Sequence, residues 1–236
     1  MVDLIKVSKT YPPRVHALVD VSLTVHAGEM LFLTGMSGAG KTTLLRLLCR
    51  GETPDKGLVE VAGQDLDRLS GSGLQQLRRR IGMAYQDFKL LPRHTVAENI
   101  ALAMEVAYRK RSFIRKRTRE LLEKLRLADK YATPAGELSR GEQQRISIAR
   151  ALANMPDLVL ADEPTGNLDR ETTALVMDLF REHEERGATI IIATHDRELF
   201  SDGSHRVIEL TAGQLRSPEE PGRTGERSLH NEEASQ

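Results

Sequence analysis

The segment Gly35-Met-Ser-Gly-Ala-Gly-Lys-Thr42 decides the fold class, because it combines three glycines with a lysine and a threonine at fixed spacing. It follows an apolar, strand-like run from Met30 to Thr34 and begins a helical pattern from Lys41 to Arg50. A strand, a glycine-rich turn and a helix in this order are the context that a phosphate-binding loop requires. The sequence therefore predicts an α/β protein that binds a polyphosphate.

Each residue type in this loop suits phosphate binding. Gly35, Gly38 and Gly40 let the backbone turn tightly, so that its N–H groups and the helix N-terminus face the phosphates. Lys41 adds a positive charge, and the hydroxyl of Thr42 is placed to bind Mg²⁺. The alternative, a glycine-rich turn without a ligand, is disfavoured because both flanking elements match. The predicted nucleotide-binding residues are Gly35, Met36, Ser37, Gly38, Ala39, Gly40, Lys41, Thr42 and Thr43.

A second apolar strand, Leu158 to Ala161, ends in the carboxylates Asp162 and Glu163. We expect Asp162 to hold Mg²⁺ through water and Glu163 to polarise an attacking water. The alternative is a pair of helix-capping carboxylates before Pro164. A phosphate loop alone fits kinases, GTPases and many ATPases. With the two carboxylates the sequence predicts Mg²⁺-dependent hydrolysis of a bound nucleotide.

The remaining apolar patterns predict strands and helices in alternation, with a largely helical middle. We expect a parallel-sheet core with a helical insert. Almost no apolar residue occurs from Ser217 to Gln236, so we expect this tail to be disordered. The other expected strands are Val2 to Val7, Leu58 to Val61, Ile81 to Tyr85, Thr189 to Ala193 and Val207 to Leu210. The other expected helices are Thr95 to Ala107, Phe113 to Leu127, Glu142 to Ala153 and Arg170 to Arg186.

Composition excludes several classes of protein. The 236 residues include 34 basic and 34 acidic side chains, so no global positive field exists and we expect no nucleic-acid partner. The single cysteine, Cys49, allows neither an internal disulfide nor a thiolate metal pair, which favours a reducing compartment. No apolar run reaches the roughly 18 residues of a membrane span, and the N-terminus has no signal-peptide pattern. We therefore expect a cytosolic chain.

A third motif, Leu138-Ser-Arg-Gly-Glu-Gln-Gln-Arg145, directly precedes a helical pattern and forms a second potential phosphate-binding helix N-terminus. By itself, Ser-Arg-Gly-Glu is an ordinary capping box. Its position between the two other motifs favours a ligand role, and with all three the chain resembles the ATP-binding cassette family. The resemblance implies a P-loop NTPase with a RecA-like core and an antiparallel β subdomain. It also implies an ATPase domain over residues 1–216 with a helical subdomain inserted at about 88–152.

The resemblance further implies a head-to-tail homodimer with two ATP molecules held between the subunits. In this arrangement Ser139, Arg140, Gly141 and Glu142 approach the nucleotide of the other subunit. Arg140 stands where the family pattern has glycine, and Glu142 stands where it has glutamine. Because Ser139 and Gly141 are retained, we expect binding across the interface to persist and Arg140 to affect the turnover rate.

Four further residues match landmarks of the family at their own positions. The resemblance implies that Tyr11 stacks on adenine and that Gln86 contacts Mg²⁺ and the attacking water. It implies that Asp169 lies in a loop at the dimer interface and that His195 contacts the γ-phosphate. Taken singly, a strand-end tyrosine, a surface glutamine or a structural histidine would be ordinary, but their order along the chain favours the functional interpretation.

The segment Glu163-Pro-Thr-Gly-Asn-Leu-Asp169 resembles the small stand-alone ATPases of lipoprotein, peptide and cell-division systems. The stretches Phe32 to Gly35, Gly82 to Leu91 and Thr95 to Asn99 favour the cell-division branch. This resemblance implies an integral membrane partner, and ATP cycles that control peptidoglycan hydrolases from the cytoplasmic face of the septal membrane. The alternatives are an ATPase for lipoprotein release or for macrolide or peptide export, and a slow, nucleotide-gated scaffold.

Two surface features suggest partners. The apolar cluster Phe88, Leu90, Leu91 and Pro92 follows Gln86 and could accept a helix from the membrane partner, although hinge packing explains it equally well. From Arg109 to Arg119 the sequence has seven basic residues and no acidic one. Such a run is either a solvated helix face or a contact with anionic lipid, where each cation contributes roughly 1 kcal/mol.

Overall fold

The central element is a six-stranded sheet with the order β10-β9-β3-β8-β7-β6, seen in the computed structural model, which describes residues 1–216. Five of its strands are parallel, and β10 pairs antiparallel with β9. The predicted disordered tail, Ser217 to Gln236, lies outside the described residues. The strands are β3 (Met30–Thr34), β6 (Ile81–Ala84), β7 (Leu158–Asp162), β8 (Thr189–Ala193), β9 (Arg206–Thr211) and β10 (Gln214–Arg216).

Strand order explains why motifs far apart in sequence meet. Strands β3, β8 and β7 are neighbours and run in the same direction, so their carboxyl ends lie at one edge of the sheet. The phosphate loop follows β3, the two carboxylates end β7, and His195 follows β8. Ligand-binding residues at the carboxyl ends of parallel strands are the common arrangement in open α/β sheets.

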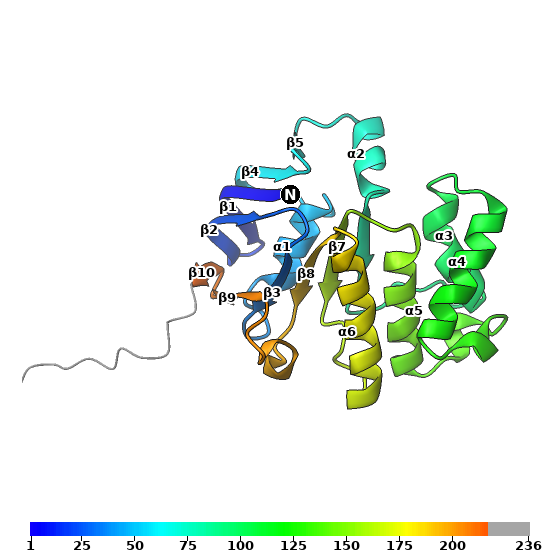
Figure 1. Ribbon diagram of the computed structural model, residues 1–236. Helices are drawn as coiled ribbons and strands as arrows, with labels where there is room; N and C mark the ends of the chain where they lie inside the picture. The colour runs from blue at the N-terminus through cyan, green and yellow to red at the C-terminus, as the bar shows by residue number, and fades with distance from the viewer. Residues whose placement is uncertain (217–236) are drawn as a thin grey trace, which may run out of the picture.

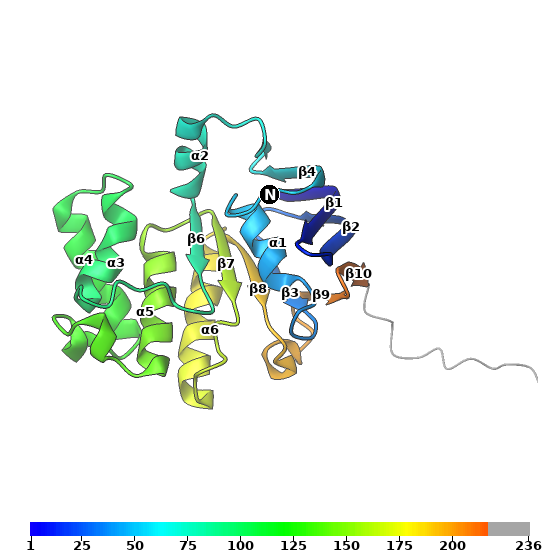
Figure 2. The ribbon, with the colours of Figure 1, turned by 180° about the vertical axis from the view of Figure 1, so that it is seen from behind.

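Both faces of the central sheet are covered, as continuous apolar strands require. Met30 and Phe32 pack into one core with helices α5 (Arg140–Ala153) and α6 (Arg170–Glu185). Leu31 and Leu33, which point to the opposite face, pack into a second core with α1 (Lys41–Leu48). Figures 1 and 2 show α6 and α1 on opposite sides of the strands.

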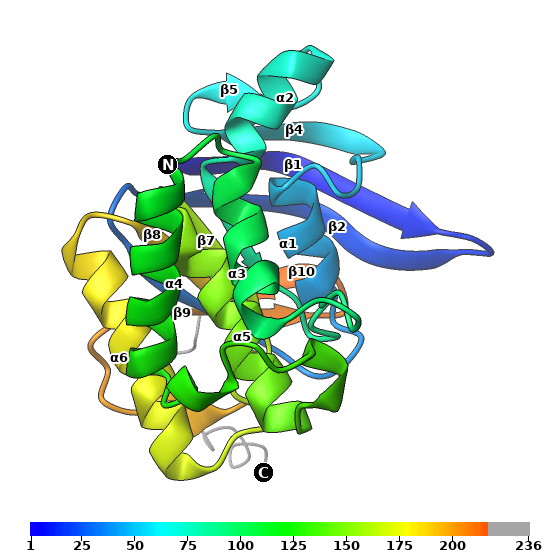
Figure 3. The same ribbon diagram turned by 90° about the vertical axis from the view of Figure 1, so that its right-hand side faces the viewer.

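A second, antiparallel sheet has the order β2-β1-β4-β5. It lies beside α1, which contacts strands of both sheets (Figure 1). Its strands are β1 (Val2–Tyr11), β2 (Val15–Val25), β4 (Lys56–Val61) and β5 (Gln64–Asp65). The helices α3 (Val96–Glu105) and α4 (Arg111–Lys124) stand beside α5 at the far end of the molecule from this sheet (Figures 1 and 3). The described residues also form three short 3₁₀ turns, at Ala128–Lys130, Ala135–Glu137 and Arg197–Phe200.

The structure corrects several sequence expectations. Strand β1 continues to Tyr11, four residues beyond the expected end at Val7. Strand β2 was not expected, because its apolar residues alternate only in part with exposed polar ones. Helix α2 (Gly71–Arg78) was also not expected, since its two glycines have low helix propensity; its N-cap Ser70 accepts a hydrogen bond from the Gly73 N–H. Strands β5 and β10 were not expected either, because they are too short to show an alternation of apolar and polar residues.

The seven basic residues between Arg109 and Arg119 do not all lie on one exposed face. Arg117 is only 3% exposed. Its guanidinium is ion-paired to Glu120 at 2.8 Å and donates a hydrogen bond to Nε2 of His183 on α6 at 3.0 Å. The other six basic residues of the run are exposed, so Arg117 belongs to the packing between α4 and α6. Among residues 1–216 no helix is both long and apolar enough to span a membrane.

Candidate functional site

A cavity of about 770 Å³ lies at the edge of the central sheet where β3, β7 and β8 end. Its size is in the range of small-molecule sites. Fourteen of its lining residues were predicted from sequence: Tyr11, Met36, Ser37, Gly38, Ala39, Gly40, Lys41, Thr42, Thr43, Gln86, Arg140, Asp162, Glu163 and His195. Four others were not predicted, namely Val15, Ala17, Gly166 and Asn167.

The turn between β3 and α1 requires glycine at two positions. Gly35 has φ 140°, and a Cβ built there would lie 2.2 Å from the carbonyl oxygen of Leu210. Gly40 has φ 110°, and a Cβ there would lie 2.2 Å from the carbonyl oxygen of Ala17. These contacts explain why the loop can pass so close to neighbouring strands only with glycine at both positions. The loop then presents its backbone and the N-terminus of α1 to the cavity.

Lys41 is the first residue of α1 and is 7% exposed. Its ammonium donates a hydrogen bond of 2.7 Å to the carbonyl oxygen of Gly35 and lies 3.4 Å from Oε1 of Glu163. The loop thus curls around the lysine and directs the charge toward the carboxylates at the end of β7. This is the position from which an ammonium can neutralise a bound phosphate.

Glu163 directly follows β7 and contacts residues at and just after the end of β8. Its second carboxylate oxygen, Oε2, lies 3.0 Å from Nδ1 of His195, and its backbone N–H donates to the Ala193 carbonyl oxygen at 2.8 Å. Glu163 also has φ 48°, a left-handed conformation that is unfavourable for a glutamate. Such strain is typical of functional positions. The carboxylate therefore stands between Lys41 and His195, at the rim of the cavity.

Asp162 is 2% exposed, so burial raises the pKa of its carboxyl group. The neighbouring Glu163 charge also raises the pKa, whereas a hydrogen bond with Thr42 and the charge of Lys41 lower it. Carboxylate and hydroxyl oxygens are suitable ligands for Mg²⁺, so Thr42 and Asp162 fit this ion. Within the described part of the chain no three His, Cys, Asp or Glu side chains cluster as a metal site. Mg²⁺ bound here would complete its coordination with phosphate oxygens and water.

Residues of β1 and β2 also line the cavity. They are Tyr11, Val15 and Ala17, and the Lys9 ammonium lies 5.4 Å from the centroid of the Tyr11 ring. The Tyr11 hydroxyl is buried and has no hydrogen-bond partner among residues 1–216. The exposed side chain of Gln86, which follows β6, lines the cavity as well.

The third motif forms the beginning of α5, and its capping box is present. The Glu142 N–H donates to the Ser139 hydroxyl at 3.3 Å, and the Ser139 N–H donates to Glu142 Oε2 at 2.8 Å. The Ser139 hydroxyl also donates to Glu142 Oε2 at 2.8 Å, and the hydrogen bonds that the carboxylate accepts from the Ser139 hydroxyl and N–H lower the pKa of Glu142. Ser139, Gly141 and Glu142 lie outside the cavity of their own chain, whereas Arg140 lines it, with its guanidinium 5.8 Å from the Phe88 ring centroid.

Asp169 also lies outside the cavity, and it caps α6 by accepting a hydrogen bond of 2.8 Å from the Thr172 N–H. That hydrogen bond lowers the pKa of Asp169. The structure therefore brings together the phosphate loop, Gln86, Asp162, Glu163 and His195. Of the residues expected to act across a dimer interface, Arg140 lines this cavity. The cavity does not include the others, Ser139, Gly141, Glu142 and Asp169.

One sequence signal could have identified two of the four unpredicted lining residues. Gly166 and Asn167 lie between Glu163 and Asp169, directly after the strand that carries the carboxylates. A search of that segment for cavity residues would have included them. Val15 and Ala17 belong to β2, whose existence the sequence pattern did not reveal.

Comparison with known proteins gives the family. The sequence profile described as ABC transporter matches residues 18–166, which include the phosphate loop, the α5 motif and both carboxylates. The chain belongs to the ABC transporter family. This cassette is 43% identical over 225 residues to the Cell division ATP-binding protein FtsE of Bacillus subtilis (strain 168), covering 95% of the chain and 99% of that protein. It is 44% identical over 215 residues to the FtsE of Escherichia coli (strain K12), covering 91% and 97%.

A solved structure has the same architecture. The dimeric post-hydrolysis state of the ATP-binding cassette MJ0796, bound to ADP and Pi, superimposes on this cassette with a TM-score of 0.85 and 36% identity. The match covers 91% of this chain and 96% of that one. The expected fold, an ABC-type P-loop NTPase, is confirmed. Family membership and the similarity to a cassette solved with ADP and Pi also confirm the sequence prediction of an ATPase whose cofactors are ATP and Mg²⁺.

Proposed function

We propose that the chain is the ATP-hydrolysing subunit that, as a nucleotide-sandwich dimer, drives the membrane protein FtsX at the division septum and so regulates peptidoglycan hydrolysis. The observation that carries this proposal is the 43% identity to the Bacillus subtilis FtsE, which extends over 95% of this chain and 99% of the relative. The proposed location is the cytoplasmic face of the bacterial inner membrane, with the cassette bound peripherally.

The dimer explains the residues that stay outside the cavity. Ser139 and Gly141 begin a helix whose N-terminal N–H groups favour an anion, yet neither lines the cavity of its own chain. In a head-to-tail dimer they would face the phosphates bound by the other subunit, and Asp169 would lie at the interface. The similar cassette MJ0796 is itself dimeric in two solved structures.

The arrangement supports a specific division of roles in hydrolysis. ATP supplies the phosphoanhydride bond, and Mg²⁺ supplies positive charge beside it. Glu163 would orient the attacking water or accept its proton, and Lys41 and His195 would stabilise the negative charge that develops on the phosphates. Thr42 and Asp162 would hold Mg²⁺, with Gln86 at the edge of the same site.

A strained turn connects the site to the helices. Phe88 and Lys89, which follow Gln86, are both in the left-handed region, with φ 61° and 49°. Arg150 on α5 holds this turn by donating hydrogen bonds to their two carbonyl oxygens, at 2.6 and 2.7 Å. We propose that the helices within residues of about 88–152 move as one subdomain about this turn when the γ-phosphate is bound or released.

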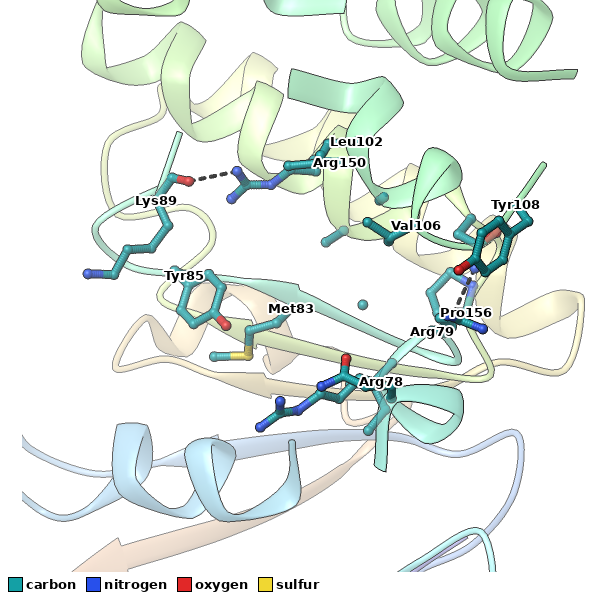
Figure 4. A pocket seen from close by; sticks show the side chains of 16 residues that line it. Arg78, Arg79, Met83, Tyr85, Lys89, Leu102, Val106, Tyr108, Arg150 and Pro156 are labelled. Carbon is teal, nitrogen blue, oxygen red and sulfur yellow. Dashed lines mark hydrogen bonds between the residues drawn. The ribbon is translucent and has the colours of Figure 1, made fainter. Parts of the chain in front are cut away.

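The proposed partner site differs in detail from the predicted apolar cluster. Phe88 is buried and Leu90 is partly buried against the core, whereas Leu91 and Pro92 are exposed. A groove of about 630 Å³ lies nearby, between α2 and β6 on one side and α3 and α5 on the other (Figure 4). We place the docking of FtsX in this groove, because Lys89 of the strained turn lines it.

The exposed basic residues around the α3–α4 connection support a secondary contact with anionic lipid. Six of the seven residues in the run remain at the surface, and this connection and α2 lie at the same end of the molecule (Figure 1). A cassette docked through the groove would present them toward the bilayer. The exposed members are Arg109, Lys110, Arg111, Arg115, Lys116 and Arg119.

Affinity capture tests the proposal. The Glu163→Gln variant, which we expect to bind ATP and hydrolyse it slowly, is purified from its own cells in mild detergent with ATP present. Recovery of FtsX is the expected result. Recovery of a lipoprotein-release or export permease would leave the ATPase roles intact and overturn the cell-division process. An ATPase rate at background level for the complex purified with the wild-type chain would instead favour the nucleotide-gated scaffold.

A further inference from the structure

Arg140 lines the nucleotide cavity of its own chain, although its neighbours on both sides, Ser139 and Gly141, do not. It is the first residue of α5 and is exposed. Its guanidinium lies 5.8 Å from the centroid of the Phe88 ring, within the range of a cation–π contact. A glycine at position 140, as in the family pattern, has no side chain to make this contact. Arg140 therefore gives this chain a link between the beginning of α5 and the strained turn.

Phe88 is the residue through which α5 holds the strained turn. Its carbonyl oxygen accepts hydrogen bonds from the Ser147 hydroxyl at 3.2 Å and from Arg150 at 2.6 Å. The residue is only 7% exposed. Arg140, Ser147 and Arg150 all belong to α5, so the helix contacts Phe88 over about three turns, beginning at its first residue.

The backbone of Phe88 needs such support. Its φ of 61° is left-handed, which is unfavourable for a residue with a bulky side chain. Residues in this region keep their conformation only where the surrounding structure holds them. Gln86, two residues earlier, lines the nucleotide cavity, so its position depends on the path of this turn. Loss of a contact with Phe88 would let the turn relax and Gln86 move.

We infer that Arg140 is a positioning residue that acts within its own subunit: its guanidinium holds Phe88 and so fixes Gln86 beside the nucleotide of the same chain. This inference rests on the proposed dimer and on the proposed place of Gln86 in the hydrolytic site, and it adds a residue to that site. It separates Arg140 from Ser139 and Gly141, which the proposed dimer places against the phosphates of the other subunit. The alternative is that Arg140 also contacts those phosphates.

The first arm of the test measures hydrolysis and ATP binding separately in the full chain. Arg140→Gln is expected to lower kcat about two- to fivefold, the effect of losing an exposed cation–π contact, while ATP affinity changes by less than about twofold. Arg140→Lys keeps a cation that can lie over the ring and should recover part of the rate. The matched control, Arg181→Gln on α6, lies outside the cavity and should leave kcat unchanged. A loss of ATP affinity as large as the loss of kcat would indicate direct contact with the nucleotide and overturn the inference.

A double-variant cycle tests whether Arg140 acts through the ring. Phe88→Leu removes the ring and keeps an apolar side chain at this buried position. We expect Arg140→Gln to cause no further loss of kcat in the Phe88→Leu background. The same loss in both backgrounds would refute the assigned contact. If Phe88→Leu fails to fold, as shown by its unfolding curve, the Arg140→Lys variant and the mixed dimers decide the question.

Mixed dimers separate action within a subunit from action across the interface. Two full chains with different affinity tags are co-expressed, and pairs that carry both tags are isolated with ATP present. In the first pair, one chain carries Arg140→Gln and the other Glu163→Gln, so hydrolysis depends on the site whose own chain lacks Arg140. In the second pair, one chain carries both substitutions and the other is wild type. The competent site of the second pair has Arg140 in its own chain and lacks it only across the interface.

The reference for both is a pair of one wild-type chain and one Glu163→Gln chain. We expect only the first pair to hydrolyse ATP more slowly than the reference, by about two- to fivefold. Slower hydrolysis by the second pair alone would place Arg140 against the nucleotide of the other subunit and overturn the inference, and equal rates for all pairs would overturn it too. If no pair with both tags can be isolated, the proposed dimer is refuted, and the cycle with Phe88→Leu still decides the role of Arg140. The cycle also decides if the reference pair is inactive.

Discussion

The buried contact between Arg117 and His183 gives a quantitative expectation for stability. The Arg117 guanidinium donates to Nε2 of His183 at 3.0 Å and to the Leu152 carbonyl oxygen at 3.3 Å. Nδ1 of His183 lies 2.7 Å from the Leu179 carbonyl oxygen and so carries the proton, which leaves Nε2 as the acceptor. One side chain of α4 thus satisfies two buried acceptors, one on α5 and one on α6.

Arg117→Ala would leave Nε2 of His183 without a donor, whereas the Leu152 carbonyl oxygen would keep the Met155 N–H at 3.2 Å. One unpaired buried group costs about 1–3 kcal/mol. The variant also removes a buried charge whose hydration is partly lost in the fold, which offsets part of that cost. We expect the free energy of unfolding to fall by about 2 kcal/mol, or Tm by roughly 4–8 °C for a domain of this size.

Urea unfolding followed by circular dichroism measures this difference directly. The matched control is Arg119→Ala, which removes an exposed arginine two residues further along α4 and is expected to change stability by less than about 0.5 kcal/mol. A cycle with His183→Ala and the double variant should give a coupling energy of about 1–2 kcal/mol. A loss below about 1 kcal/mol for Arg117→Ala, or one equal to that of the control, would refute the role assigned to this contact.

The other expectations concern pH and the nucleotide site. Burial lowers the pKa of His183, so between the unfolded value near 6.5 and the lower folded value the unfolded chain binds more protons, and stability falls as pH decreases. Unfolding at about pH 7.5 and about pH 5.5 should show this loss in the wild type and a smaller one in His183→Gln; equal losses would contradict it. Gly40→Ala should reduce ATP binding at least tenfold in equilibrium fluorescence titrations, because its Cβ would meet the Ala17 carbonyl oxygen at 2.2 Å. Gly71→Ala, on α2 outside the cavity and with nothing within 4 Å of the added Cβ, serves as the control. Lys41→Ala should abolish ATP binding in the same titration. Binding at wild-type strength would refute the role of the Lys41 ammonium in holding the phosphates. Asp162→Asn should raise the Mg²⁺ concentration that gives half-maximal ATP hydrolysis by roughly 10-fold or more. An unchanged Mg²⁺ titration would exclude Asp162 as a ligand.

Local sequence was sufficient for the phosphate loop and the strands beside it. Glycine spacing, the apolar run of β3 and the carboxylates that end β7 are properties of short segments, and the structure has these elements at the predicted places. The predicted ends of five helices agree with the observed ends to within a few residues, because each helix keeps an apolar stripe against the core. These helices are α1, α3, α4, α5 and α6. The cofactors and the family could therefore be inferred before the fold was known.

Tertiary structure decided the features that depend on which segments become neighbours. The contacts of Glu163 with Lys41 and His195 exist because β3, β8 and β7 are adjacent, and no local pattern specifies strand order. The burial of Arg117 depends on α6, 66 residues away at His183, and the groove proposed for FtsX joins residues from four separate elements. Local patterns report the propensity and amphipathicity of a segment, whereas the neighbours of a side chain depend on the packing of the whole chain.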